Sequence, residues 1–178
     1  MIVLTTSRNP APGIRSFTRD LSHILSATVL TRGKTNLRGL DAAVRELNAE
    51  KLILVSRGPS GPGRLEFKKL HRGHLTSVPP TILLSTVRLR REYNVHGRFK
   101  VDSVTCQDSE DLMLKRFTIA LSEFLNIPLA EEARGSKASL HVAKTPSHRI
   151  FVTVMDHDGK REVGPSFIIH HLIWETER

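Results

Sequence analysis

The stretch Thr5-Thr6-Ser7-Arg8-Asn9-Pro10 is the first turn of the chain, and it separates two patterns that predict regular structure. The apolar run Ile2-Val3-Leu4 before it is typical of a short buried strand. The hydroxyl residues, Asn9 and the two prolines, Pro10 and Pro12, end that strand and turn the chain. Apolar residues then recur at helical spacing through residue 25. The opening therefore predicts a strand, a polar loop and a helix.

This loop is basic as well as polar, and it leads into the start of the predicted helix. Unpaired N–H groups and the helix dipole favour an anion at such a position. Arg15 and Arg19 lie four residues apart on the face opposite the apolar stripe and extend the positive surface. We interpret this surface as one that meets the phosphates of RNA. The alternative is that the loop only caps the helix.

A second corner of the same kind follows the first helix. Residues 27–31 predict a short strand, Arg32-Gly33-Lys34-Thr35-Asn36 a basic loop, and residues 37–47 a helix. Gly33-Lys34-Thr35 imitates the end of a nucleotide-binding P-loop, but that motif needs a glycine where this chain has Thr28, which excludes an NTPase. If the two strands are neighbours, we expect Arg8, Arg32 and Lys34 to flank one groove.

Charge is distributed unevenly along the 178 residues. The net charge is +9 and the pI about 10.3. Residues 1–100 carry 18 Lys and Arg against 6 Asp and Glu, whereas residues 101–178 carry 9 against 12. A basic half joined to a slightly acidic half favours a nucleic-acid partner for the first, although basic charge also serves solubility. Aromatic residues make up only 5%, which favours contact with the backbone and shape of a folded RNA over base stacking.

The remaining patterns extend this alternation of strands and helices. We expect a single domain over residues 1–178, with an N-terminal half of about 1–96 and a C-terminal half of about 97–178. Both halves begin with a strand, a turn and an amphipathic helix, which suggests duplication of an α/β unit. Further strands are predicted at 51–56, 64–70, 81–93, 99–105, 140–143, 150–155 and 163–174, a helix at 112–125, and loops at 57–63, 79–80 and 131–137.

The segment 81–93 carries further arginines. Val87 and Leu89 alternate with Arg88 and Arg90, so a strand here would have one apolar face and one arginine-lined face. That second face would add to the phosphate surface. A solvated edge strand protected by charge is the alternative.

Several other classes of protein are not favoured. A single cysteine, Cys106, excludes an internal disulfide and suggests a reducing intracellular compartment. His71 and His74 have no carboxylate or cysteine nearby to complete a metal site, and no catalytic motif occurs. No apolar run approaches the roughly 20 residues of a membrane span, and the start lacks a secretory leader. We therefore expect a cytoplasmic protein that is not an enzyme and binds no metal, cofactor or membrane.

An ordered set of short motifs resembles the Brix domain of ribosome-biogenesis proteins. Near the end, Gly164-Pro165-Ser166-Phe167 is similar to the sigma-factor-like Gly-Pro-x-Phe motif of that family, although many members carry a basic residue where Ser166 stands. The family's proline-threonine pair usually follows glycine and here follows Pro79. The other motifs are Thr6-Ser7-Arg8-Asn9-Pro10, Arg15-Ser16-Phe17, Arg32-Gly33-Lys34, Leu52-Ile53-Leu54-Val55, Pro62-Gly63-Arg64-Leu65, Pro80-Thr81 and Val87-Arg88-Leu89-Arg90-Arg91.

This resemblance covers nearly the whole chain and is greatest to compact members of archaeal type. It implies an α/β fold of two similar halves, each with a β-sheet and packed helices, related to the anticodon-binding domain of class II aminoacyl-tRNA synthetases. It also implies binding to ribosomal RNA, and in relatives to a guide RNA, during pre-rRNA processing and subunit assembly. Larger relatives are nucleolar.

The leading hypothesis is therefore a ribosome biogenesis factor whose partners are ribosomal RNA or pre-rRNA and ribosome-assembly proteins. One alternative is a protein-interaction scaffold that uses the acidic second half and the apolar strand ending at Trp174. A tRNA-binding module is the other. The residues expected to contact RNA are Ser7, Arg8, Asn9, Arg15, Arg19, Arg32, Lys34, Arg88 and Arg90.

Overall fold

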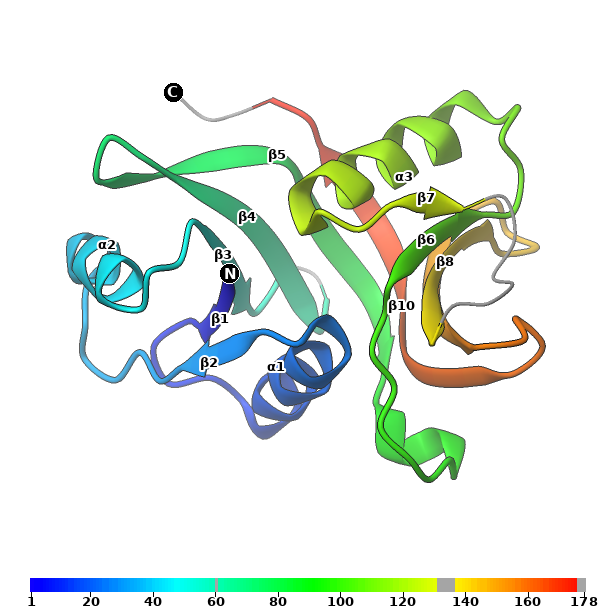
Figure 1. Ribbon diagram of the computed structural model, residues 1–178, viewed down its shortest axis with the longest axis horizontal. Coiled ribbons are helices and arrows are strands. Elements are labelled where there is room, and N and C mark those ends of the chain that lie inside the picture. Colours follow the sequence, from blue (N-terminus) through cyan, green and yellow to red (C-terminus); the bar gives the residue numbers. More distant parts are fainter. Residues whose placement is uncertain (60, 131–136, 176–178) are drawn as a thin grey trace.

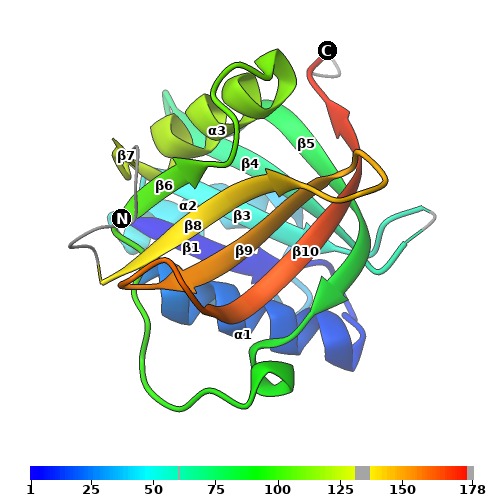
Figure 2. The same ribbon diagram turned by 90° about the vertical axis from the view of Figure 1, so that its right-hand side faces the viewer.

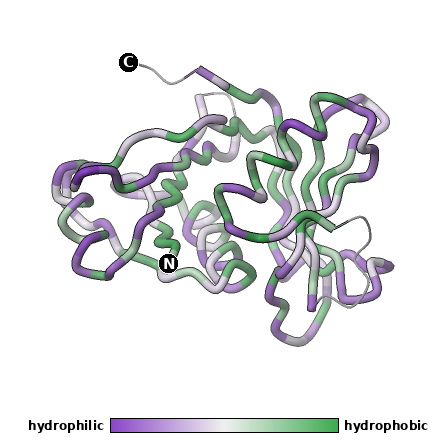
Figure 3. Tube along the Cα trace, turned by 45° about the horizontal axis from the view of Figure 1, so that its top comes forward, coloured by the Kyte–Doolittle hydropathy of each residue, from purple (hydrophilic) through white to green (hydrophobic). Residues whose placement is uncertain are grey.

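The computed structural model describes residues 1–59, 61–130 and 137–175. Within them the chain forms an α/β structure with three α-helices and one sheet of ten strands (Figure 1). The strands lie in the order β2-β1-β3-β4-β5-β10-β9-β8-β6-β7. Hydrophobic residues concentrate along the strands and hydrophilic residues at the connections between them (Figure 3).

The helices are α1 (Pro12–Leu25), α2 (Leu37–Glu46) and α3 (Leu112–Leu125), and a 3₁₀ turn, η1, spans Arg90–Tyr93. The strands are β1 (Ile2–Thr6), β2 (Thr28–Leu30), β3 (Lys51–Ser56), β4 (Gly63–His71), β5 (His74–Arg88), β6 (Ser103–Cys106), β7 (Leu129–Ala130), β8 (Ala138–Lys144), β9 (Ile150–Asp156) and β10 (Glu162–Ile173).

The first part of the sheet is built around β1. This strand lies between β2 and β3 and is parallel to both, while β3, β4 and β5 follow one another antiparallel. Because side chains alternate across a strand, Leu4 packs in the core that holds α1, whereas Val3 packs with Val44 of α2 in a smaller cluster. One helix therefore covers each face of β1 and β3.

The second part of the sheet is built in the same way around β6. This strand is parallel to β7 and β8 on its two sides, and β8, β9 and β10 are antiparallel neighbours. Strand β10 then pairs antiparallel with β5. In Figure 2, β8, β9 and β10 run side by side in front, with α3 above and α1 below.

Helices α1 and α3 match at an offset of 100 residues. Thr18 and Thr118 each donate a hydroxyl hydrogen bond to the carbonyl four residues earlier, at 2.8 and 2.7 Å. Ser26 and Asn126 each end their helix in the left-handed conformation. The identical pairs are Phe17 and Phe117, Thr18 and Thr118, Leu21 and Leu121, Ser22 and Ser122, and Leu25 and Leu125.

The structure corrects two expectations about the sheet. We expected a sheet in each half, and the described strands instead form one continuous sheet joined by the β5–β10 pair. We also expected a break at Pro79-Pro80, but both prolines lie inside β5. They occur where the β4–β5 register shifts between Leu65 and Phe67, and a bulge tolerates residues that cannot donate to the ladder.

Other boundaries also differ from the prediction. The arginine-bearing strand ends at Arg88, and the chain then forms η1, where the Leu89 N–H donates to the Glu92 carboxylate at 2.5 Å. Of the strand predicted at 99–105 only residues 103–105 are formed, and the strand continues to Cys106. The short strand β7 was not predicted. The loop predicted at 131–137 lies outside the described residues except for residue 137.

Candidate nucleic-acid interface

A cavity of about 680 Å³ lies between the ends of β1 and β2 and the first half of α1. Six of the nine residues that the sequence predicts for RNA binding line it: Ser7, Asn9, Arg15, Arg19, Arg32 and Lys34. We call this hollow the basic cavity. It forms because parallel neighbours such as β1 and β2 carry their following loops to the same edge of the sheet.

The loop after β1 is held by its backbone. The Ser7 N–H donates to the carbonyl of Val55 at 3.0 Å, which extends the pairing with β3 by one residue. Asn9 then turns the chain with a φ of 50°, a conformation that asparagine adopts more readily than most residues. Helix α1 buries Ile14 and Phe17 and leaves Arg15 and Arg19 exposed. One face of the helix thus packs on the sheet while the other carries charge.

The loop after β2 supplies Arg32 and Lys34 to the basic cavity. Arg32 Nε donates to the carbonyl of Thr35 at 3.0 Å, so this half-buried arginine is anchored in its own loop. Lys34 is exposed. Asn36 caps α2, its side chain accepting from the N–H of Gly39 at 2.8 Å. The basic loop is therefore fixed at both ends.

The charge of the basic cavity is not neutralised by the described part of the chain. Among the described residues, Arg15, Arg19, Arg32 and Lys34 form no ion pair. Residues 1–40 contain a single carboxylate, Asp20, and its Oδ2 accepts from the backbone N–H of Arg90 at 2.9 Å. The cations are thus available to an external anion.

The other three predicted residues lie outside the basic cavity. Arg8 is exposed but does not line it. Arg88 Nη2 donates to the carbonyl of Glu92 at 3.0 Å, and its guanidinium lies 4.1 Å from the ring centre of Tyr93. Arg90 bonds the carbonyl of Gly97. Both side chains are engaged around η1, and their part in RNA binding stays a prediction.

The N-terminus of α1 faces a hollow other than the basic cavity. Gly13 and Ile14 line a separate hollow of about 650 Å³ together with Arg57 and residues of η1 and β5. The sequence suggested that the basic side chains and the first N–H groups of the helix converge on one point. In the structure they do not. The arginines, lysine and polar side chains alone make the basic cavity.

An equivalent hollow of about 480 Å³ lies between β6, α3 and β7, but its chemistry differs. Lys115 is its one cation among the described residues. Ile119 and Leu129 stand at the positions equivalent to Arg19 and Val29. Leu112, Met113 and Leu129 are exposed nearby, at 81%, 58% and 52%. The two corners therefore have the same arrangement of strands and helix but differ in charge.

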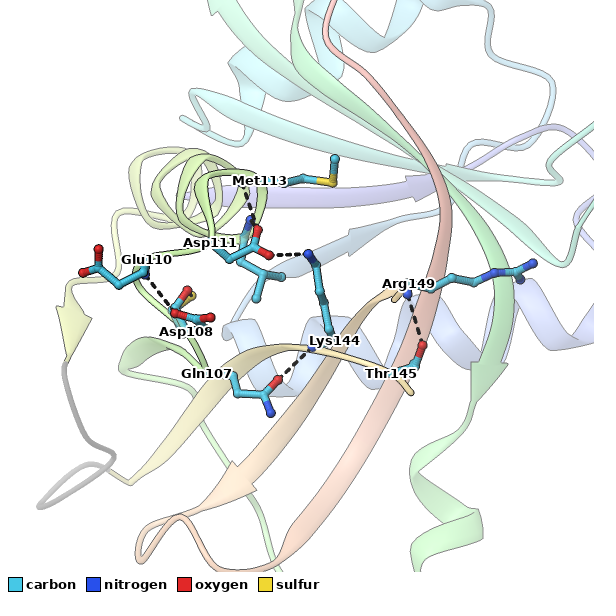
Figure 4. A network of polar contacts seen from close by, with 10 residues as sticks. Gln107, Asp108, Glu110, Asp111, Met113, Lys144, Thr145 and Arg149 are labelled. Carbon is cyan, nitrogen blue, oxygen red and sulfur yellow. Dashed lines mark hydrogen bonds and ion pairs between the residues drawn. The ribbon is translucent and has the colours of Figure 1, made fainter. Parts of the chain in front are cut away.

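The acidic loop before α3 is held within the fold. Asp111 caps the helix by accepting from the N–H groups of Met113 and Leu114 at 3.1 and 3.0 Å, and it forms an ion pair with Lys144 (Figure 4). Gln107 Oε1 accepts from the Lys144 N–H at 2.9 Å. The bond from Lys144, more than those from the helix backbone, lowers the pKa of Asp111. Lys144 is consequently committed to this network.

Cys106, His141, His170 and His171 lie on strands β6, β8 and β10. His141 Nδ1 lies 2.8 Å from the hydroxyl of Thr105, and burial lowers the pKa of this histidine. Cys106 Sγ lies 3.2 Å from the carbonyl oxygen of Asp108. His170 and His171 are both exposed on β10.

Within the described ranges, no helix has the length and apolar character needed to cross a bilayer.

No family model matches the chain. It is 25% identical over 168 residues to a protein of Methanococcus maripaludis named probable Brix domain-containing ribosomal biogenesis protein, with 94% of each chain covered. A protein of the same name from Pyrococcus horikoshii is 30% identical over 101 residues, which are 54% of this chain and 43% of that one.

Two crystal structures share the fold. The probable ribosomal biogenesis protein from Aeropyrum pernix superposes with a TM-score of 0.76 and 23% identity, covering 99% of this chain and 97% of that one. Mil, described as an archaeal Imp4-like protein, superposes with a TM-score of 0.70 and 21% identity, covering 97% and 99%. In sequence, this chain is thus similar to archaeal proteins named probable Brix domain-containing ribosomal biogenesis proteins, which is the resemblance that its motifs predicted.

Proposed function

We propose that this protein is a ribosome biogenesis factor that binds ribosomal RNA or pre-rRNA through its basic cavity. The observation that carries the proposal is the convergence of Arg15, Arg19, Arg32 and Lys34, from two separate loop-and-helix corners, on one hollow without an internal ion pair in the described structure. Cations in such an arrangement bind phosphates and release counterions. The names of the sequence relatives agree with this role.

We also infer that the chain consists of two similar halves derived from one α/β unit, within a single domain over residues 1–178. The matching of α1 with α3 and the equivalent surroundings of β1 and β6 support this inference. Only the first half then kept, or acquired, a basic corner. A relation to anticodon-binding domains and a cytoplasmic location belong to the same proposal and rest on the family resemblance.

The test is the salt dependence of binding to a structured ribosomal RNA fragment. Each phosphate contact contributes roughly 0.7–0.9 to the slope of log affinity against log salt concentration. Replacing Arg15, Arg19 and Lys34 together by glutamine should reduce the slope by about 2 to 3. The matched control replaces Arg72, Arg149 and Arg161, three exposed arginines outside the basic cavity, and removes the same charge. Equal slopes in the two triple variants would refute the proposal.

A protein-interaction surface is the second candidate, and the exposed apolar residues Leu112, Met113 and Leu129 favour it. The strand ending near Trp174, which the sequence suggested for this role, lies between β5 and β9. The Arg116 guanidinium also lies 3.8 Å from the centre of the Trp174 ring. A ribosome-assembly protein that stays bound after RNase treatment, and is released by Leu112→Ser with Leu129→Ser, would support this function.

Competition between tRNA and ribosomal RNA tests the third candidate, a tRNA-binding module.

A further inference from the structure

We infer that the basic cavity receives one unpaired nucleotide of the bound RNA, extruded from a bulge or loop, with its base against Val29. This inference rests on the proposed RNA-binding function and names the RNA feature that the site selects. The shape of the hollow, an apolar residue that lines it and the polar groups around it point to such a nucleotide.

The shape favours a single nucleotide over a duplex. The hollow of about 680 Å³ lies between α1 and the ends of β1 and β2 and is partly open to solvent. This volume falls within the roughly 300–1,000 Å³ of pockets that enclose small ligands. A duplex presents its phosphates on a convex surface, which would contact the rim and leave the interior empty. An extruded nucleotide would enter it.

Val29 provides an apolar surface within the basic cavity. Val29 pairs with Leu4, whose side chain packs in the core with α1, so both side chains lie on the α1 face of the sheet. Val29 lines the basic cavity and remains 47% exposed. Since phosphates alone would use only the cations, this valine is the surface on which we place the base.

The polar residues of the basic cavity complete the match to a ribonucleotide. Ser7, Asn9 and Thr31 line it, and their side chains take part in no hydrogen bond within the described structure. Hydroxyl and amide groups can bind the 2′-hydroxyl or the edge of a splayed base, which is how proteins recognise unpaired RNA. Arg15 and Arg19 on one wall and Lys34 on the other would then hold the flanking phosphates.

The test compares two RNA hairpins that share one stem, only one of which contains a single-nucleotide bulge. The bulged hairpin should bind about fivefold more tightly, the factor that corresponds to burying the exposed part of one valine side chain. Val29→Gln should abolish this preference without changing the salt slope. Leu129→Gln, at the equivalent exposed position of the second half, should leave the preference intact.

A second measurement does not depend on any variant. A 2-aminopurine in the bulge should change its fluorescence when the unsubstituted protein binds, and the same base placed within the stem should not. Equal affinity for the two hairpins with a steep salt slope, or an unchanged bulge fluorescence, would overturn the inference and leave the proposed function standing. If neither hairpin binds in a salt-dependent way, both the inference and the proposed function are overturned.

Discussion

The ammonium group of Lys51, on β3, lies 2.8 Å from the Oδ1 of Asn126, the residue that ends α3. The same nitrogen donates to the carbonyl of Phe124 at 2.5 Å, and Lys51 is only 5% exposed. A lysine from the first part of the chain therefore completes the C-terminus of a helix in the second, where carbonyl groups and the helix dipole favour a cation.

This buried lysine should make stability depend on pH in a defined direction. Burial, helped by the charge of Lys69 and opposed by that of Glu50, lowers the pKa of Lys51. Between that lowered pKa and the ordinary value of about 10.4, the unfolded state binds more protons than the folded state. The free energy of unfolding should therefore rise with pH across this window, relative to a Lys51→Met variant. Urea titrations of both proteins from pH 7 to pH 10 measure the difference, and a constant difference would contradict the prediction.

Two glycines should respond oppositely to alanine substitution. Gly164 has a φ of +65°, and a Cβ there would lie 2.4 Å from the ring of Tyr93, whose hydroxyl bonds Ser166. Gly164→Ala should therefore destabilise the fold by about 2 kcal/mol or more. Gly13, within α1, has no atom within 4 Å of the same position. Gly13→Ala should be neutral or stabilise by up to about 1 kcal/mol. Urea unfolding compares the two variants, and equal effects would rule out the steric explanation.

Asp20 should tune the basic cavity from outside it. It follows Arg19 in sequence and is the single carboxylate of residues 1–40, and the N–H of Arg90 holds its Oδ2. Asp20→Asn keeps an acceptor for this bond and removes the charge. RNA affinity should rise about two- to threefold at low salt, and the gain should vanish at high salt because the Debye length shortens. Binding isotherms at two salt concentrations test this, with Asp158→Asn, on the exposed β9–β10 turn, as the control.

The basic cavity could be predicted in outline because it follows from parallel strands. Ser7 follows β1 directly and Arg32 follows β2 after one residue, and neighbouring parallel strands end at one edge of the sheet. The direction of Arg8 could not be predicted, since it depends on backbone angles such as the positive φ of Asn9. Arg88 lies in β5, as predicted, whereas the conformation of Arg90 was misjudged because η1 replaces the end of the predicted strand through the local bond between Leu89 and Glu92.

The order of elements suggested a duplication, but the match of α1 with α3 at an offset of 100 residues was not visible in the sequence patterns. The two helices share residues that pack and end them, such as Phe17 with Phe117 and Ser22 with Ser122, while exposed positions differ in charge, as Arg19 and Ile119 show. The hydroxyl of Thr18 or Thr118 bonds within its own helix. Many helical threonines do the same, so the pair is recognised only when the structure aligns the two helices. Strand β7 was missed because two residues carry no periodicity.

The capping residue of α3 should make stability fall in acid. The bond from Lys144, followed by those from the helix backbone, lowers the pKa of Asp111. A carboxylate of this kind contributes stability above its unfolded pKa of about 3.9 and loses it as pH falls through the folded value. Asn also caps helices but does not titrate. The stability advantage of the unsubstituted protein over Asp111→Asn should therefore shrink between pH 5 and pH 2 in urea titrations. Lys144→Met should reduce this pH dependence, because it deletes the largest cause of the shift, and an unaltered dependence in that variant would refute the assignment.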